Sequence, residues 1–139
     1  MSLKPKIEGG KFIITAEVGP PKGADVKYLL DEAELFKEKV DATNVTDIQS
    51  SVMRVGSLAV CHLLKDRGHD PVFQLTCRDR NRLALQSDIL SAAILGIENI
   101  LILTGDHQVL GDHPQAKGVF DLNSIQLLEV VKGLQEGHD

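Results

Sequence analysis

The sequence predicts an α/β fold with a parallel sheet, because strand-like and helix-like segments alternate four times along its 139 residues. Each strand-like segment is a short apolar run, and each is followed by an amphipathic stretch long enough for a helix. The four units recur at a spacing of roughly 30 residues, the size of one βα unit. The expected strands are Phe12–Val18, Ala42–Thr46, Pro71–Leu75 and Asn99–Leu103.

The first two helices are predicted from apolar side chains at helical spacing. The turn Gly19–Pro21 ends the first strand, and Gly23–Asp25 opens a helix. The apolar stripe of this helix comprises Val26, Leu29, Leu30, Ala33, Phe36 and Val40. The second helix is expected from about Met53 to Arg67, where Gly68 stops it. Its inward side chains are Val55, Leu58, Ala59 and Leu63.

The third helix is expected over about Arg80–Leu95, capped by Asp79 and stopped by Gly96. The fourth strand is the most apolar of the four, so we expect it to be the most buried. A long loop, Gly105–Gly118, follows it, and loops of this length in compact domains are usually functional or disordered. The last helix is expected to start near Asp121 or Asn123 and to end by Gly133.

Four βα units are half of an eightfold (βα)8 TIM barrel, which takes about 250 residues. We therefore expect residues 12–139 to be the first half of such a barrel, with residues 1–11 a flexible N-terminus. A fifth strand would come next after the last helix, where the sequence ends. An open half-barrel would expose its inward side chains, which we take to be those of Ile13, Val45 and Phe73 or their neighbours.

Charge and composition exclude several classes of function. A net charge of -5 disfavours a surface that neutralises phosphates, so nucleic acid is not an expected partner. No apolar run is long enough for a membrane span, and the N-terminus lacks the apolar core of a signal peptide. Cys61 and Cys77 lie in different expected elements and form no zinc or disulfide spacing. These features favour a soluble protein of the reducing cytoplasm.

Polar residues stand at or just beyond the carboxyl end of each expected strand. In parallel α/β folds, and above all in barrels, chemistry takes place at these ends. The sequence therefore predicts one site built from four separate loops. Its candidate residues are Glu17, Asp47, Thr76 with Cys77, and Gly105 with Asp106.

Glu17 is the sharpest single candidate, because it interrupts an apolar strand two residues before the Gly19–Pro21 turn. We expect its carboxyl group to be desolvated, which would let it hold a proton near neutral pH and act as a general acid. The alternative is a structural carboxylate paired with a polar group of the neighbouring strand. Thr104–Asp106 gives a weaker signal, since glycine lets a flat ligand approach the backbone but Gly-Asp turns are common.

Two charged clusters suggest binding sites, but each has a plainer explanation. His107, Asp112 and His113 are residue types that ligate zinc or iron, yet no third anchored ligand accompanies them, so no metal is expected. Arg78, Arg80 and Arg82 could hold a phosphate or carboxylate at a helix N-terminus. The favoured explanation of these arginines is a set of surface ion pairs with Asp79 and Asp88. No dinucleotide-binding or P-loop motif is present in the sequence.

The sequence resembles the methylenetetrahydrofolate reductase family, and the resemblance covers nearly the whole chain from Phe12 to Asp139. Four short motifs occur at the expected strand ends in the family's order and spacing; they are Thr15–Pro21, Asn44–Asp47, Leu75–Cys77 and Leu103–Asp106. The loop from Gly105 to Pro114, leading into Val119–Asp121, is similar to that of the branch found in anaerobic and one-carbon-metabolising microbes.

This resemblance implies a (βα)8 flavoprotein oxidoreductase that reduces 5,10-methylenetetrahydrofolate to 5-methyltetrahydrofolate, in one-carbon metabolism and methionine biosynthesis. It implies FAD, with FMN as the alternative, and NAD(P)H or a partner redox subunit as electron donor. Glu17 is implied as the general acid, and Asp106 as a residue near both flavin and pterin. The flavin contacts are implied at Thr46, Gln74, Thr104, Gly105, Asp106 and Phe120.

Two positions depart from the family pattern: Gln74 stands where many relatives have histidine, and Thr104 where many have arginine. Two alternatives to the reductase also stay open. One is a non-catalytic half-barrel that self-associates or binds a partner subunit. The other is a pterin- or cobalamin-linked methyltransferase barrel, which would not need flavin. Whichever interpretation holds, a half-barrel has unpaired strand edges and is therefore expected to form an oligomer.

Overall fold

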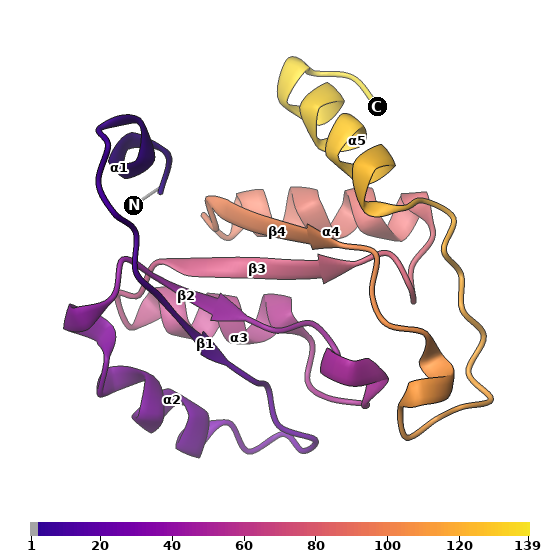
Figure 1. Cartoon of the computed structure of the whole chain (residues 1–139), viewed down its shortest axis with the longest axis horizontal. Coiled ribbons are helices and arrows are strands. Elements are labelled where there is room, and N and C mark those ends of the chain that lie inside the picture. The colour runs from indigo at the N-terminus through magenta and orange to yellow at the C-terminus, as the bar shows by residue number, and fades with distance from the viewer. Residues whose placement is uncertain (1–2) are drawn as a thin grey trace.

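The computed structural model describes residues 3–139, which form a four-stranded parallel sheet in the order β1-β2-β3-β4 (Figure 1). The expected parallel α/β sheet is therefore confirmed, and its arrangement is consistent with part of a TIM-barrel-like fold. The strands are β1 (Thr15–Val18), β2 (Ala42–Val45), β3 (Pro71–Thr76) and β4 (Asn99–Leu103).

The helices cover one face of this sheet and leave the other open. In Figure 1, α3 and α4 lie behind the strands, α2 lies beside β1, and α5 lies beside β4. The longer helices are α2 (Lys27–Glu34), α3 (Ser57–Asp66), α4 (Arg82–Ile94) and α5 (Ser124–Glu136). Residues 3–139 also form three single 3₁₀ turns, at η1 (Lys37–Lys39), η2 (Gln49–Ser51) and η3 (Gln108–Leu110). No helix within residues 3–139 is long and apolar enough to cross a membrane.

The hydrophobic core lies between the sheet and its helices. Val45 and Phe73 point into this core and are almost completely buried, so the expectation that they line the open face is wrong. Successive side chains of a strand alternate between faces, and it is their neighbours that face away from the helices. The side chains of the open face include those of Glu17, Asn44, Val72, Gln74 and Leu101, which the strand register aligns across the sheet.

Burial of the strands follows their place in the sheet rather than their apolar content. All six residues of β3 are buried, whereas β4 is half-buried and Leu101 is exposed. The expectation that the fourth strand is the most buried is therefore wrong, although its bounds match. The reason is that β4 lies at an edge of the described sheet, with β3 on one side and no strand on the other.

Several helix ends differ from the expected ones. Asn81, not Asp79, caps α4, where its side chain accepts a hydrogen bond from the backbone N–H of Ala84. Asn123 caps α5 in a capping box with Gln126, and the helix continues beyond Gly133 to Glu136. Helix α3 begins at Ser57, four residues later than expected.

The N-terminal segment, expected to be flexible, contains a short helix, α1 (Lys4–Glu8), at the amino ends of the strands (Figure 1). The backbone N–H of Leu3 donates to the Asn99 side chain at 2.9 Å, and Lys6 pairs with Asp41 at 3.2 Å. Lys11 also contacts Asp41, whose side chain is almost buried. These contacts attach the segment to β4 and to the start of β2.

Candidate active site

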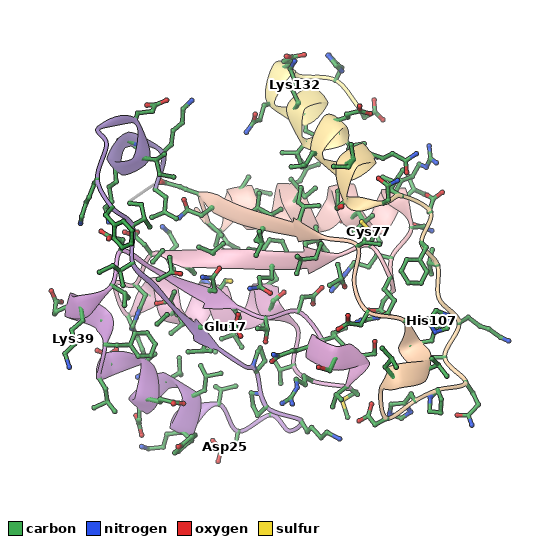
Figure 2. All side chains as sticks on the ribbon, viewed as in Figure 1. Glu17, Asp25, Lys39, Cys77, His107 and Lys132 are labelled. Atoms are coloured by element: carbon green, nitrogen blue, oxygen red, sulfur yellow. The ribbon has the colours of Figure 1, made fainter. Side chains whose placement is uncertain are left out.

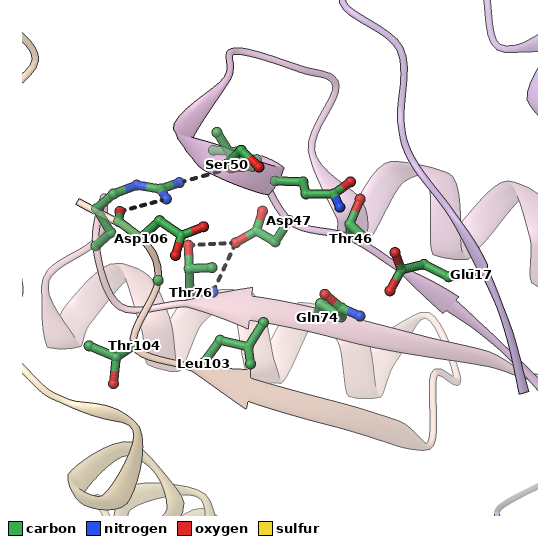
Figure 3. Close-up of a pocket in the computed structure, with 13 residues that line it drawn as sticks. Glu17, Thr46, Asp47, Ser50, Gln74, Thr76, Leu103, Thr104 and Asp106 are labelled. Atoms are coloured by element: carbon green, nitrogen blue, oxygen red, sulfur yellow. Dashed lines mark hydrogen bonds between the residues drawn. The ribbon is translucent and has the colours of Figure 1, made fainter. Parts of the chain in front are cut away.

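A cleft of about 380 Å³ lies at the carboxyl ends of the four strands, where the sequence analysis places the candidate site (Figure 3). Residues at or after the ends of all four strands line it. Glu17 and Asp106 stand on opposite sides of the cleft, with Thr46, Asp47 and Gln74 between them. Side chains far apart in the sequence therefore meet in one site.

The Asp47 carboxylate, directly after β2, forms the floor of this cleft. Its side chain is fully buried and accepts hydrogen bonds from the N–H and hydroxyl of Thr76, both at 2.9 Å. Ser57 donates to the same carboxylate at 3.3 Å and also to the carbonyl oxygen of Gln74 at 2.8 Å. Because every oxygen is engaged, Asp47 joins β2, β3 and α3 instead of offering a free base.

The three arginines of the Arg78–Arg82 cluster are ion-paired, as expected, but two of them are not on the surface. Arg80 pairs with Asp47 and, at 3.0 Å, with Asp88. Burial acts to lower the pKa of Arg80, but the hydrogen bonds and charge of Asp47 raise it above its ordinary value. Arg78 is 1 % exposed and pairs with Asp79. Arg82 is the exposed member and binds Asp121.

Glu17 lies on the open face of β1, at the near side of the sheet in Figure 2. Its side chain is exposed, so the expected desolvation is not present in the described structure. The physical reason is that β1 is an edge strand and no element within residues 3–139 covers this face. The carboxyl group is thus free to reach a molecule bound in the cleft.

Thr46 and Gln74 are two of the buried polar residues that line the cleft. The Thr46 hydroxyl oxygen is inaccessible to solvent and has no hydrogen-bond partner in the described chain. A buried hydroxyl without a partner costs free energy, typically about 1–3 kcal/mol, unless a ligand or water satisfies it. The arrangement therefore suits a ligand with hydrogen-bonding groups along its edge.

Gly105 turns the chain at the end of β4 with a φ of +95°. An added Cβ would lie 3.1 Å from the Arg78 Cβ and 3.2 Å from the Thr76 Cβ, so a side chain has little room there. Asp106 follows and is exposed, and its carboxylate points into the cleft in Figure 3. Glycine at this point therefore lets the loop return closely over β3.

The long loop after Gly105 lies across the ends of the first two βα loops. Its Asp112 accepts hydrogen bonds from Lys22 at 2.7 Å and from the backbone N–H of Met53 at 2.9 Å. Gly111 lies against Ser51, where an added Cβ would be only 1.8 Å from the Ser51 carbonyl oxygen. These contacts give the loop a fixed position.

The histidines of this loop lie apart from any cluster of three possible metal ligands within residues 3–139. No group of three histidine, cysteine, aspartate or glutamate side chains in residues 3–139 is arranged to hold a metal ion. His107 instead stacks on Phe120, with 6.4 Å between ring centroids and 16° between planes. Asp112 is engaged with Lys22.

Both cysteines are buried and free, and burial raises the pKa of each thiol. The pKa of Cys61 rises to about 12, to which the negative charge of Asp47 also contributes. A thiol with a raised pKa holds little thiolate at neutral pH, and the thiolate is the nucleophile. The cysteines are therefore core residues and not catalytic groups.

Comparison with protein families shows that the methylenetetrahydrofolate reductase model matches residues 2–138. The chain belongs to the methylenetetrahydrofolate reductase family. A comparison with curated proteins finds no match. Membership indicates an oxidoreductase of one-carbon metabolism that acts on a folate.

Among the positions that the resemblance assigns to a cofactor in this methylenetetrahydrofolate reductase family member, five line the cleft. These are Thr46, Gln74, Thr104, Gly105 and Asp106. The Thr104 hydroxyl exchanges hydrogen bonds with Ser124, and in Figure 3 its side chain points away from Asp47. Phe120 lies outside the cleft, with a φ of +42°, stacked on His107.

Sequence reasoning did not foresee the buried position of Arg78 or the role of Ser51. Ser51, with a φ of +59°, donates from its hydroxyl to the carbonyl oxygen of Asp106 at 2.9 Å. The sequence does not indicate that a serine adopts the left-handed backbone conformation, because Gly, Asn and Asp are the residues expected in that conformation. An arginine next to aspartate likewise has the pattern of a surface pair.

Proposed function

We propose that this chain supplies the first four βα units of a (βα)8 barrel that reduces 5,10-methylenetetrahydrofolate to 5-methyltetrahydrofolate with a flavin. The observation that carries the proposal is the single cleft shared by Glu17, Gln74 and Asp106 in a member of this family. An acid, an amide and a carboxylate at the ends of three strands are suited to proton transfer and to hydrogen bonding of a flavin and a folate.

The residues of the cleft fit a flavin ring. The Thr46 hydroxyl lacks a partner within residues 3–139, and the Gln74 amide can both donate and accept along a heteroaromatic edge. Gly105 lines the cleft and has no side chain of its own there. When bound, a flavin supplies the hydride chemistry of the reduction. We assign FAD to this site, with FMN as the alternative.

Glu17 acts as the general acid. From the open face of β1 its carboxyl group can give a proton to a nitrogen of the folate's five-membered ring. Protonation opens that ring to an iminium, the form whose carbon accepts a hydride. Asp47 is unsuited to this role, because all its acceptor sites are taken by Thr76, Ser57 and Arg80.

Asp106 acts through its charge. Its carboxylate stands at the rim opposite Glu17 and can accept hydrogen bonds from N–H groups of a pterin. A negative charge next to a flavin also disfavours the anionic reduced form, and so lowers the reduction potential.

Flavin binding tests the proposal. The purified chain is titrated with FAD, FMN and methylenetetrahydrofolate in turn, and binding is followed by flavin fluorescence and by calorimetry. We expect FAD to bind and Gln74→Ala to weaken it, while Gln135→Ala, on the exposed end of α5, has no effect. Folate binding without any flavin binding would instead support a pterin-linked methyltransferase. Binding of neither ligand would favour the non-catalytic half-barrel.

A further inference from the structure

We propose that Arg78 is a positioning residue, a clamp that holds loop 105–118 at both ends and thereby fixes Asp106 at the rim of the cleft. The role of Asp106 in this inference rests on the proposed function. The clamp itself is inferred from contacts within the chain, and nothing in the family assignment requires it.

The guanidinium of Arg78 is saturated by the protein. Its Nε and Nη2 atoms donate to the Asp79 carboxylate at 2.8–3.1 Å, and Nη2 also donates to the carbonyl oxygen of Ile48 at 3.2 Å. Its Nη1 atom donates to the Ser51 hydroxyl at 2.9 Å and to the carbonyl oxygen of Asp106 at 3.0 Å. All five N–H donors of an arginine thus have acceptors.

This saturation argues against a role in binding an anion. The side chain of Arg78 is 2 % exposed, so a phosphate or carboxylate from solution would have to displace Asp79, Ser51 and two carbonyl oxygens. A guanidinium held in this way is a structural connector between loops. In the sequence the arginine cluster suggests a phosphate site. In the structure its first member, Arg78, connects loops instead.

Arg78 contacts the long loop at its start and at its end. The guanidinium holds the carbonyl oxygen of Asp106, and the carbonyl oxygen of Arg78 accepts a hydrogen bond from the N–H of Val119 at 2.7 Å. Arg78 alone therefore holds loop 105–118 both where it leaves the fold and where it rejoins it. The Cβ of Arg78 also lies beneath Gly105, where the loop turns.

The same guanidinium holds the loop after β2. Ile48 and Ser51 have φ values of +47° and +59°, which are unfavourable for residues with side chains and need support from their surroundings. Arg78 binds the Ile48 carbonyl oxygen and the Ser51 hydroxyl, and that hydroxyl in turn donates to the carbonyl oxygen of Asp106. The two loops that carry Asp47 and Asp106 are thus connected through Arg78.

Lysine cannot replace arginine here, because its three donors radiate from one atom and cannot reach four groups in a planar fork. In the purified chain, Arg78→Lys should speed hydrogen exchange roughly tenfold at the amides of Leu110 and Gly111, near the end of the loop that the guanidinium holds, the effect of losing charge-assisted hydrogen bonds. The amides of β2 and β3 should keep their rates. The matched control is Arg67→Lys, at the exposed end of α3, which should change none of these rates. Equal rates in the two variants, or faster exchange throughout the sheet, would overturn the clamp.

Ser51→Ala keeps the inference testable if Arg78→Lys fails to fold. It removes the hydroxyl that joins Arg78 to Asp106, so the same loop amides should exchange faster while Arg78 is intact. Unchanged loop rates in Ser51→Ala would argue against the connection.

A cycle of variants separates the clamp from the proposed function. If Arg78 acts through Asp106, Arg78→Lys should change the flavin reduction potential in the native background and leave it unchanged in an Asp106→Asn background. Equal shifts in both backgrounds would contradict action through Asp106. Failure to bind flavin would count against the proposed function alone, because hydrogen exchange decides the clamp without any ligand.

Discussion

Asp47 and Arg80 form a two-point ion pair beneath the cleft, with Arg80 Nη1 2.7 Å from Asp47 Oδ2 and Nη2 3.1 Å from Oδ1. The carboxylate is fully buried and the arginine side chain is 17 % exposed. Removing one partner of such a pair is destabilising, because the other partner's charge stays buried without its main counter-charge. The pair therefore joins the carboxyl end of β2 to the turn before α4.

We expect Asp47→Ala to lower the free energy of unfolding by about 3–5 kcal/mol, because Arg80 loses its main partner and Thr76 loses its acceptor. Urea unfolding followed by circular dichroism measures the change. The control is Asp66→Ala, whose carboxylate is exposed and lies 3.6 Å from His62 on α3, and which should change stability little. If Asp47→Ala lowers the free energy of unfolding by less than about 1 kcal/mol, the pair contributes no more than an exposed surface ion pair.

Acid should release the long loop. The hydrogen bond from Lys22, followed by that from the N–H of Met53, lowers the pKa of Asp112 from 3.8 to about 2. A carboxyl group whose pKa is depressed by docking stabilises the docked loop above its ordinary pKa. That contribution is lost as the pH falls from about 4 through about 2.

The pH dependence of the Met53 amide resonance measures this release. We expect it to titrate with an apparent pKa near that of Asp112, and the titration to disappear in Asp112→Asn. Asp25→Asn, in the exposed turn before α2, should leave it in place. A Met53 titration that persists in Asp112→Asn would assign the pH dependence to another group.

The order of the elements and the place of the cleft follow from sequence periodicity, whereas burial and helix ends depend on contacts between distant residues. The apolar run Asn99–Leu103 predicts a strand but not whether a neighbour pairs with each of its edges. Asp79 and Asn81 are both good capping residues, and Asn81 is the cap because Arg78 engages Asp79.

Within the site, the strand ends predict the positions of Glu17 and Asp106 but not their surroundings. Whether Glu17 is desolvated depends on what covers the inner face of the sheet, which local sequence does not report. The burial of Arg78 depends on Ile48, Ser51 and Asp106, which come from two other loops. Contacts between loops carry no periodic signal, so the sequence does not predict this part of the site.

Glu17→Gln should abolish folate reduction while sparing reduction of the flavin by its donor. Loss of a general acid costs about 10²–10⁴-fold in rate, and the flavin half-reaction does not use this proton. Stopped-flow kinetics of the two half-reactions separate the effects. Glu32→Gln, exposed on α2, is the control. Near-native folate turnover in Glu17→Gln would remove Glu17 from the chemistry.

Asp106→Asn should raise the flavin reduction potential and weaken folate binding. Without the carboxylate, the anionic reduced flavin is less disfavoured, and the pterin loses a charged acceptor worth about 1.5–3 kcal/mol. Redox titration and equilibrium binding measure the two effects, with Asp66→Asn as the control. A potential that stays the same or falls would contradict the placement of Asp106 beside the flavin.

The last prediction is that the 139-residue chain alone does not persist as a stable monomer. Within residues 3–139, the outer edges of β1 and β4 are unpaired and the inner face has no covering layer. The accessible surface is 8073 Å², against about 7,100 Å² for a typical folded monomer of this mass. The excess, roughly 1,000 Å², is close to what one partner buries in a standard interface.

Open strand edges and apolar surface favour association. Sedimentation velocity should therefore show dimers or larger species, and their fraction should rise with protein concentration. Leu101→Lys, on the exposed inner face of β4, should weaken this association because a charge on an edge strand opposes pairing. Leu83→Lys, which is also an exposed leucine but lies on α4, should not. If the chain sediments as one monomeric species and unfolds cooperatively, the open face is stable in water. The half-barrel interpretation would then be wrong.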